Sequence, residues 1–534
     1  MPSEREAVYQ VVVDWNNDAD FSDTSEDVTN DVLARSAPTI DVGRDQVREL
    51  TPPMIGAASF ELNNSAKTYS AEFPGSPIYG LLLPGRAAEI RASAGGTVNY
   101  DDDVDYDSDL VYNGDPVAIF TGIIDEPVQN PEHDKRSVSI RAFGSMTKLQ
   151  KNVSTELYEG IATGTAITNL LDAAGWSATK RDIDTGQSTL LYFWAADEDA
   201  LALAIRVAST EGAGAALYED GEGVIHFEDR TYRSLETRST TSQATFFDLS
   251  IGTEGFYEEE VAYDSVVPYE NPYGIHHVSP LRYAPGFRDI VNSVSLEVTQ
   301  RTVAALAVIW TYGTTLTLGA SEVKTITAKL QSDPAKAIVC TNGVDVTVSA
   351  GSIASSTINR TSGQVITITL TAGAGGATVN LLQLRGTSAA VSATITVSNL
   401  SDQSDSITKY GSRPLPASVS MLTDISVAAA EGLADAIVQR YNEPLATVDM
   451  TLVNVDGSHL SEQLSRQVSD RVTIVETQTG LNNDFWIERI GHSIQMAGKR
   501  HVTVFGCAKV ALSADDIYLW DDAAAVFDTA LWGA

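Results

Sequence analysis

One sequence pattern occurs twice in the chain, and this repetition constrains the fold more than any other feature. The first copy covers residues 86–144 and the second covers residues 471–506. In each copy an Arg opens a run of alternating apolar residues, a Phe opens a second run, and another Arg opens a third. These residues are Arg86, Phe120 and Arg136 in the first copy and Arg471, Phe485 and Arg500 in the second. Alternation with period two predicts antiparallel strands joined by hairpins. We therefore expect two related β-domains, with chance similarity between β-rich segments as the alternative.

The spacing within the two copies agrees except in one gap. Val138 follows Phe120 by 18 residues, and Val502 follows Phe485 by 17. The gap from the first Arg to the Phe is 34 residues in the first copy and 14 in the second, and the longer gap holds the acidic run 101–109. Such a run predicts a solvated, self-repelling loop. A weak cation site or a negative ring facing a channel is the functional alternative.

The length and composition of the chain limit its number of domains and the classes of partner that it can bind. Its 534 residues suggest about three to five domains. The formal net charge of −36 repels phosphate backbones, which argues against sequence-independent binding of nucleic acid. The charge suits a surface that DNA must pass without sticking, and it equally suits adaptation to salt or simple solubility. The chain has no apolar run long enough to span a bilayer and no signal-peptide core, so we expect a product made in the cytoplasm.

The pattern of strands and helices predicts a mainly β protein with α+β parts. The helix expected at 424–441 has apolar residues at a spacing of four, with Asp424 as its predicted cap. We expect the C-terminal tail to pack on a neighbouring domain or to dock on a partner protein. The expected parts are a first β-domain at 1–150, a small α+β domain at 151–240, a loop-rich connection at 241–300, an inserted β-sandwich at 301–405, a second β-domain at 406–512 with the helix 424–441, and a docking tail at 513–534.

An acidic segment near the N-terminus is the candidate metal site. Oxygen-bearing side chains recur at alternate positions, as in loops that wrap a hard cation such as Ca²⁺. Ala19 stands where such a loop would have Gly, and Ser25 stands where it would have a bidentate Glu, with Glu26 one residue late. A metal-free turn built by Asx hydrogen bonds is the alternative. The predicted ligands are Asp14, Asn16, Asp18 and Asp20.

Signals for catalysis are weak. The seven histidines form no HExxH pair, and the chain has no G-x-S-x-G elbow and no glycine-rich phosphate loop. The two cysteines, Cys340 and Cys507, have neither a metal-ligand spacing nor a disulfide framework. We expect no enzyme, and no cofactor other than the candidate Ca²⁺.

Several segments together resemble a known family. They include VVVDWNNDADFSDTSEDVTNDVL near the N-terminus, LTPPMIGAASFELNNSAKTYS, EGAGAALYEDGEGVIHFEDR, KYGSRPLP, and SDRVTI with FWIERIGHSI. In these segments the chain resembles the minor tail or tail-tip hub proteins of long-tailed, siphovirus-type phages, especially those of actinobacterial hosts. The resemblance spans most of the chain, but it rests on framework patterns. Ala19 and the acidic insertion depart from the family pattern.

The resemblance implies a structural hub of the virion. It implies two tube-like β-barrel or sheet domains, and a homotrimer that closes the six-fold tail tube or adapts it to three-fold symmetry. The implied partners are tail-tube and distal-tail proteins, the tape measure protein, other tail-tip proteins or fibres, and genomic DNA in transit, with assembly in the host cytoplasm. The 301–405 module would project outward, as a decoration or as a contact with the host cell wall. A receptor-binding adhesin acting through that module and a virion-associated cell-wall hydrolase are the alternatives.

Overall fold

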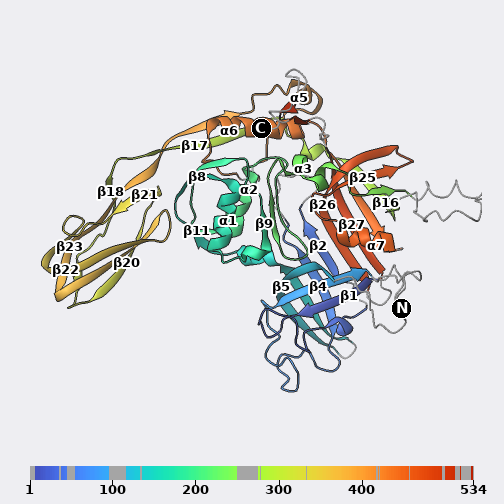
Figure 1. Ribbon diagram of the computed structural model, residues 1–534, viewed down its shortest axis with the longest axis horizontal. Helices are drawn as coiled ribbons and strands as arrows, with labels where there is room; N and C mark the ends of the chain where they lie inside the picture. The colour runs from blue at the N-terminus through green and yellow to red at the C-terminus, as the bar shows by residue number, and fades with distance from the viewer. Residues whose placement is uncertain are drawn as a thin grey trace, which may run out of the picture.

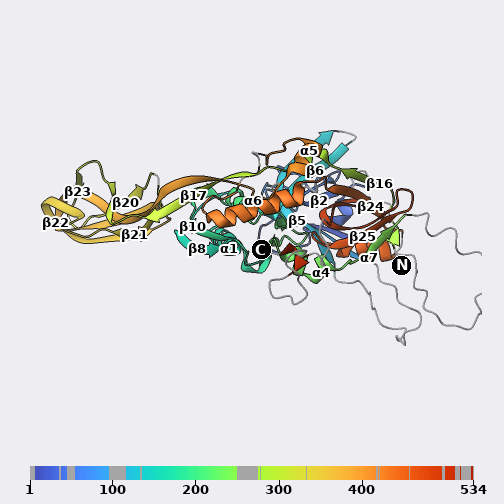
Figure 2. The same cartoon turned by 90° about the horizontal axis from the view of Figure 1, so that it is seen from above.

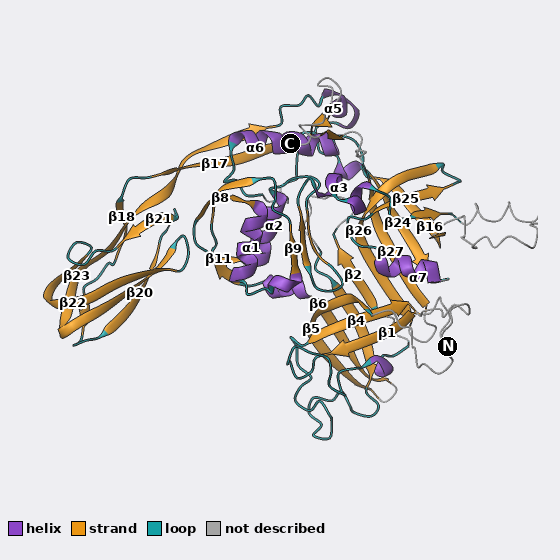
Figure 3. Ribbon diagram, viewed as in Figure 1, coloured by secondary structure: helices purple, strands orange, loops and turns teal. Residues whose placement is uncertain are grey.

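The protein is mainly β, with 49% of residues in strands and 17% in helices. The computed structural model describes residues 7–34, 38–44, 54–94, 116–132, 135–248, 275–276, 278–331, 333–416, 419, 421–455, 457–495, 500–510, 517–518 and 531–532. The largest sheet has 13 strands and lies at one side of the molecule, with a small α+β domain beside it and an elongated β-module at the far end (Figures 1 and 3). The acidic run 101–109 lies outside the described residues, as does the tail at 513–534 apart from β28 (Ile517–Tyr518) and β29 (Leu531–Trp532).

The first half of the large sheet is an antiparallel unit of six strands, which we call the first sheet unit. Alternation in the sequence produces it: in β3 the side chains of Ala58, Phe60 and Leu62 point into the core, and those between them face outward. Every neighbouring pair within the unit is antiparallel. The strand order is β1 (Ala7–Val13), β4 (Ala87–Ala94), β5 (Val117–Glu132), β6 (Lys135–Gly144), β3 (Ala57–Asn63) and β2 (Thr39–Gly43).

The second half of the sheet repeats this order, and we call it the second sheet unit. Its first pair, β14 with β25, is parallel, while the other pairs are antiparallel as in the first unit. The stretch 241–300, expected to be a loop-rich connection, thus supplies two strands of this unit, and β15 (Ile275–His276) adds to its edge. The order is β14 (Thr245–Phe247), β25 (Arg471–Glu476), β26 (Leu481–Gln495), β27 (Arg500–Lys509), β24 (Ala446–Val453) and β16 (Val278–Pro285).

The two units correspond strand by strand, but Phe120 and Phe485 are not counterparts. Both middle strands carry a one-residue bulge, which follows Ile124 in β5 and Ile487 in β26. Aligning the bulges places Phe485 against Gly122, two residues from the sequence-based match. A Cβ on Gly122 would come within 2.5 Å of the Phe120 ring, so that ring lies over the glycine. Phe120 therefore fills from two residues away the space that Phe485 fills in the second unit.

The two units share one hydrophobic core, and the sheet that they form is open in the described part of the chain. A single cluster of buried side chains includes Val11 and Phe120 from the first unit and Phe485 and Phe505 from the second. The described strands form open sheets, so the structure shows sheet units where barrels were one of the two expectations.

The α+β domain follows the first unit and is built around two helices, α1 (Thr163–Ala173) and α2 (Ala200–Ser209). Gly175 has a φ of +71°, as expected for the glycine that ends α1. β12 (Ala216–Glu219) and β13 (Ile225–Glu228) form an antiparallel hairpin. The short elements of this domain and of its borders are η2 (Ser145–Leu149), β7 (Asn152–Ser154), β8 (Tyr158–Ala162), η3 (Ala178–Lys180), β9 (Arg181–Ile183), β10 (Thr189–Phe193), β11 (Ala196–Asp199), α3 (Tyr232–Leu235) and α4 (Thr237–Thr240). Elsewhere in the chain the short elements are η1 (Thr29–Asp31), η5 (Phe287–Asp289), α5 (Ser404–Tyr410) and α7 (Gly457–Ser465).

The amphipathic helix expected at 424–441 is α6 (Val427–Tyr441), and it covers a different domain from the one expected. Its buried residues, among them Leu433 and Ile437, belong to the core of the α+β domain and not to the core of the second sheet unit. Its N-cap is Ser426, which accepts a hydrogen bond from the Ala429 N–H, so Asp424 was the wrong cap. Figure 2 shows α6 lying along the α+β domain.

The inserted module forms one sheet in which the long β23 (Val365–Ser398) pairs with all six other strands. A β-sandwich of two facing sheets was expected for this module. In the structure all of its strands belong to one sheet, because each of them pairs with β23. Its core is separate from those of the other domains. The other strands are β17 (Ser295–Val303), β18 (Ala307–Thr311), β19 (Leu316–Leu318), β20 (Val323–Lys329), β21 (Ala335–Val339) and β22 (Val346–Arg360).

Among the described residues, the helices are all too short or too polar to cross a lipid bilayer.

The module should be removable as a unit. Val303 of β17 and Ala389 of β23 face each other, so replacing residues 304–388 by Asn-Gly closes a two-residue hairpin. We expect the remaining domains to stay folded, because the module has its own core. Near-ultraviolet circular dichroism and thermal melting against the full-length chain provide the measurement. Loss of the main cooperative transition would contradict this independence.

Candidate functional site: the junction of the two sheet units

The two sheet units are joined by a ladder between β2 and β26. The register runs from Thr39 opposite Ser493 to Gly43 opposite Arg489. It is extended at both ends, because the Arg44 N–H donates to the Glu488 carbonyl (2.8 Å) and the Ile494 N–H donates to the Pro38 carbonyl (3.0 Å). β26 therefore has two partners along one edge, β25 on its first half and β2 on its second (Figure 1).

A glycine at the end of β2 allows this close approach. Gly43 has a φ of +110°, and a Cβ there would lie 2.4 Å from the Glu488 carbonyl oxygen. Only glycine combines that backbone conformation with that contact. The chain can turn away from β26 at this point without losing the ladder.

A buried ion cluster lies directly behind the ladder. Glu488, at the bulge of β26, is paired with Arg44 from the first unit and Arg233 from the α+β domain, and their side chains are at most 2% exposed. Arg233 forms a bidentate pair, with Nη1–Oε1 at 2.7 Å and Nη2–Oε2 at 3.0 Å. Arg44 donates to Glu488 Oε2 through Nε and to the Ala215 carbonyl through Nη1 (2.7 Å). One carboxylate thus holds three domains together.

A second buried carboxyl, Glu228 of β13, completes the cluster. It accepts hydrogen bonds from the Ser469 hydroxyl and from the Tyr218 hydroxyl, the latter at 2.8 Å. Burial raises the pKa of Glu228, while the charges of Arg233 and Arg44 act in the opposite direction. Two guanidinium groups facing two carboxyl groups keep the cluster close to neutral, which the low dielectric of a protein interior requires.

Sequence reasoning did not find this cluster. Arg44, Arg233 and Glu488 are far apart in the chain, and ion pairing leaves no periodic pattern. The available signal was Glu488 itself, a charge inside the apolar strand FWIERI, because a carboxylate there must be paired if it is buried.

A buried histidine pair lies near the same junction. His492 Nδ1 lies 2.9 Å from His501 Nε2 and 3.1 Å from the Thr503 hydroxyl. The Tyr9 ring of the first unit packs edge-on against His501, with ring centroids 5.7 Å apart. Burial lowers the pKa of His492 to about 4, and it lowers the pKa of His501 together with the charge of His492. The fold therefore holds both rings in their neutral form at pH 7.

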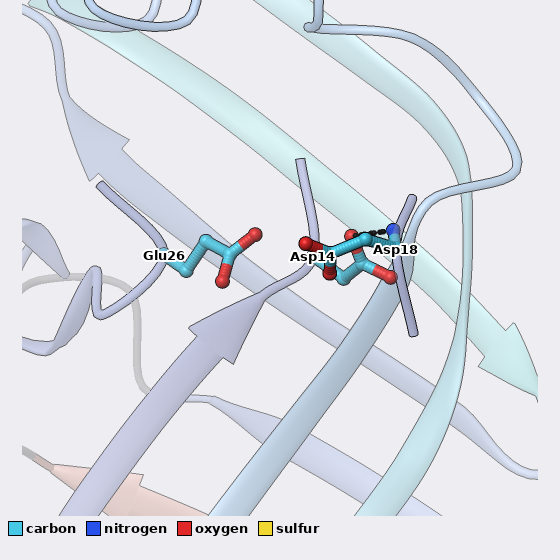
Figure 4. A group of neighbouring side chains, drawn as sticks. All are labelled: Asp14, Asp18 and Glu26. Atoms are coloured by element: carbon cyan, nitrogen blue, oxygen red, sulfur yellow. Dashed lines mark hydrogen bonds between the residues drawn. The ribbon is translucent and has the colours of Figure 1, made fainter. Parts of the chain in front are cut away.

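The residues of the predicted metal site lie in the loop that follows β1, and the structure brings only some of them together. Asp14 and Asp18 converge with Glu26, and the candidate ligand atoms of the three lie within 4.8 Å of one another (Figure 4). Asn16 instead donates to Asp18 Oδ2 and Asp23 Oδ2, both at 2.9 Å. Asp20 accepts from the Ser22 N–H at 2.8 Å, and this hydrogen bond lowers its pKa.

Ala19 adopts the backbone conformation that the expected glycine would supply. Its φ is +71°, and its N–H donates to Asp14 Oδ2 at 3.0 Å. Asp14 Oδ1 also accepts from the N–H groups of Asn17 and Asp18. The loop thus turns tightly around the Asp14 carboxylate despite the missing glycine.

Comparison with known proteins gives distant likenesses only. No protein-family model and no curated protein matches the chain. It is similar to the tail protein from Neisseria meningitidis MC58, with 10% identity, coverage of 96% of this chain and 99% of that one, and a TM-score of 0.46. It is also similar to the 43 kDa tail protein of prophage MuSo2 from Shewanella oneidensis, with 12% identity, 94% and 98% coverage and a TM-score of 0.42. The prophage tail protein gp18 from Listeria monocytogenes EGD-e shares 9% identity, with 93% and 94% coverage and a TM-score of 0.36. Scores this low do not transfer a function.

Removing the central carboxylate should loosen the junction. Glu488→Gln leaves Arg44 and Arg233 buried with too little negative charge, and we expect a loss of about 3–5 kcal/mol in stability. Asp449→Asn is the matched control. Asp449 of β24 pairs at 3.8 Å with Arg489, the neighbour of Glu488 in β26, and both side chains of this pair are more exposed. The control should cost less than about 1 kcal/mol. Chemical denaturation followed by tryptophan fluorescence measures both, and equal losses would contradict the role given to Glu488.

The histidine pair predicts a pH dependence. Unfolded histidines protonate below a pKa of about 6.5, whereas His492 in the fold does so only near 4. The unfolded state therefore takes up protons first, and stability should fall as the pH drops from about 6.5 towards 4. Thermal melting at pH 7.5 and pH 5.0 measures the fall, and His492→Gln should reduce it. An identical fall in that variant would assign the effect to other groups.

Proposed function

We propose that the chain is a structural protein of a phage tail tip, and that three copies form a ring of six sheet units closing the tail tube. The observation that supports this most directly is the shared strand order of the two units. Two similar units per chain allow three copies to match a six-fold ring. The proposed role is structural and includes no catalytic step.

The junction inside the chain suggests how copies would join. β16 corresponds to β2 by its place in the strand order, and among the described residues its outer edge has no partner strand. The second half of β5 corresponds to the second half of β26, and in the described part of the chain no strand covers its outer edge. β16 of one copy would then lie on β5 of the next, as β2 lies on β26. Such a head-to-tail contact closes into a ring when its rotation allows.

The internal ladders fix the register of this contact. Aligning the bulges and the pairs with neighbouring strands places Arg282 opposite Asn130, Tyr283 opposite Gln129 and Ala284 opposite Val128. Both edges expose apolar side chains: Tyr283 is 44% exposed and Val128 is 41% exposed. In the contact, Tyr283 would lie beside Gln129 and Val128 beside Ala284, so each exposed apolar side chain would be partly covered by its neighbour.

Two prolines make the contact between copies weaker than the one inside the chain. Pro127 and Pro131 stand where Ile490 and Ile494 stand in β26, and a proline has no N–H to donate. In the internal junction the Ile494 N–H does donate, to the Pro38 carbonyl just before β2. Prolines on an exposed edge also suppress unwanted pairing of free chains. We therefore expect a ring that is completed on the tail, with tail-tube and distal-tail proteins as neighbours.

The acidity of the chain fits a channel through which DNA passes. A groove on the solvent face of the first unit has Asp41, Glu61, Glu126 and Arg141 among its lining residues. In the proposed ring, an acidic face turned to the channel would repel DNA and let it and the tape measure protein pass.

The inserted module favours a second candidate role, as an adhesin that contacts the host cell wall. It extends away from the two sheet units (Figure 1) and exposes apolar side chains, including Val323, Val344 and Val391. Phage particles carrying the chain without residues 304–388 separate the two roles. Normal tail assembly with lost adsorption would assign adhesion to the module, and unchanged adsorption would exclude it.

Paired cysteines test the ring. In a Cys340→Ser background, Arg282→Cys with Asn130→Cys should form a disulfide between copies under mild oxidation, since such opposed residues bring their Cα atoms within disulfide range. Thr39→Cys with Ser493→Cys occupies the equivalent place inside the chain and is the positive control. Arg282→Cys with Val117→Cys, at the other end of β5, is the negative control. In assembled phage tails a covalent trimer on a non-reducing gel is expected, and its absence from those tails while the internal disulfide forms would contradict the proposal.

A further inference from the structure

The loop after β1 contains a buried carboxylate oxygen without a partner. Glu26 is only 1% exposed; its Oε2 accepts the Asp23 N–H at 3.0 Å, and its Oε1 accepts no hydrogen bond from any described residue. The side chain reaches toward Asp14 and Asp18 from the far end of the loop (Figure 4). Burying an acceptor without a donor costs free energy, and a ligand bound to this oxygen would remove that cost.

The surroundings of that oxygen are strongly negative. Asp14, itself 2% exposed, and Asp18 place their carboxylates against Glu26, with candidate ligand atoms no more than 4.8 Å apart. Within the described part of the chain, none of these three carboxylates pairs with a Lys or Arg. A bound cation would remove both the desolvation cost and the repulsion.

We propose that Asp14, Asp18 and Glu26 bind one divalent cation, with Ca²⁺ as the best match. All three ligands are hard oxygens, which Ca²⁺ and Mg²⁺ prefer. Ca²⁺ accepts irregular geometry and higher coordination numbers, which suits three carboxylates from an irregular loop supplemented by water. The ligand set differs from the one expected from spacing, because Glu26 replaces Asn16 and Asp20.

The cation would fasten both ends of the loop to the first sheet unit. Asp14 directly follows β1, and the Val13 N–H donates to the Glu26 carbonyl at 2.9 Å. Trp15 lies between the two ends, since it is buried beside Asp14 and its indole N–H donates to the Ser25 carbonyl at 3.1 Å. Trp15 is therefore placed to sensitise the luminescence of a lanthanide bound at this site.

The test uses Tb³⁺ and Ca²⁺ with the full chain. Excitation of tryptophan should give Tb³⁺ emission that Ca²⁺ suppresses, and calorimetry should show one Ca²⁺ per chain. Glu26→Gln should weaken Ca²⁺ binding at least about tenfold, and Asp18→Asn should weaken it similarly, because each removes a charged ligand. Asp20→Asn is the matched control from the same loop and should bind as the original chain does.

Three results would overturn the proposal. The first is an original chain that gives no Tb³⁺ emission and no Ca²⁺-dependent rise in Tm. The second is Glu26→Gln binding as tightly as the original chain. The third is Asp20→Asn weakening binding as much as Glu26→Gln, because the excess of acidic residues would then bind Ca²⁺ diffusely. Melting of all variants in EDTA shows whether they fold, and Asp14 is left unchanged because its carboxylate accepts three backbone N–H groups of the loop.

Discussion

The pairing of one buried carboxylate, Glu488, with two guanidinium groups is the interaction on which the arrangement of the domains depends. Arg44 comes from the first sheet unit and Arg233 from the α+β domain, so the pair fixes both against the second unit. Removing any one partner would leave a charge without compensation where water cannot reach it. Hydrophobic contacts in the shared core are less directional and would tolerate small shifts. We infer that the ion cluster sets the relative orientation of the units, while the core supplies most of the stability.

The duplication is regular in its strand order and irregular in its edges. β26 accepts β2 along a full ladder, whereas the equivalent edge of β5 carries Pro127 and Pro131. Glu488 has its counterpart at the bulge residue Asp125, which is exposed and forms no ion pair with the described residues. The junction inside the chain thus has both the ladder and the ion pairs. In the ring proposed above, the junction between copies would be the weaker of the two.

Local pattern predicted individual elements well and their neighbours less well. Alternating residues identified β5, β6, β26 and β27. The helix α6 was also identified, but its apolar face packs on the α+β domain, because amphipathicity says that a face is buried and not against what. In the acidic loop, spacing selected Asn16 and Asp20, yet their side chains make local hydrogen bonds. Glu26 joins the site because the loop folds back to the end of β1. A rule based on residue spacing does not predict that return.

The sequence by itself determined that the chain is mainly β, that one strand pattern occurs twice, and that the surface is strongly acidic. These properties follow from residue type and period, which act over a few neighbours. Only the tertiary structure decided that β14 and β16 complete the second unit, that the units share one core, and that Arg44, Arg233 and Glu488 meet. Each of these depends on contacts between residues far apart in the chain, and their energies are set by burial and geometry that local sequence does not encode.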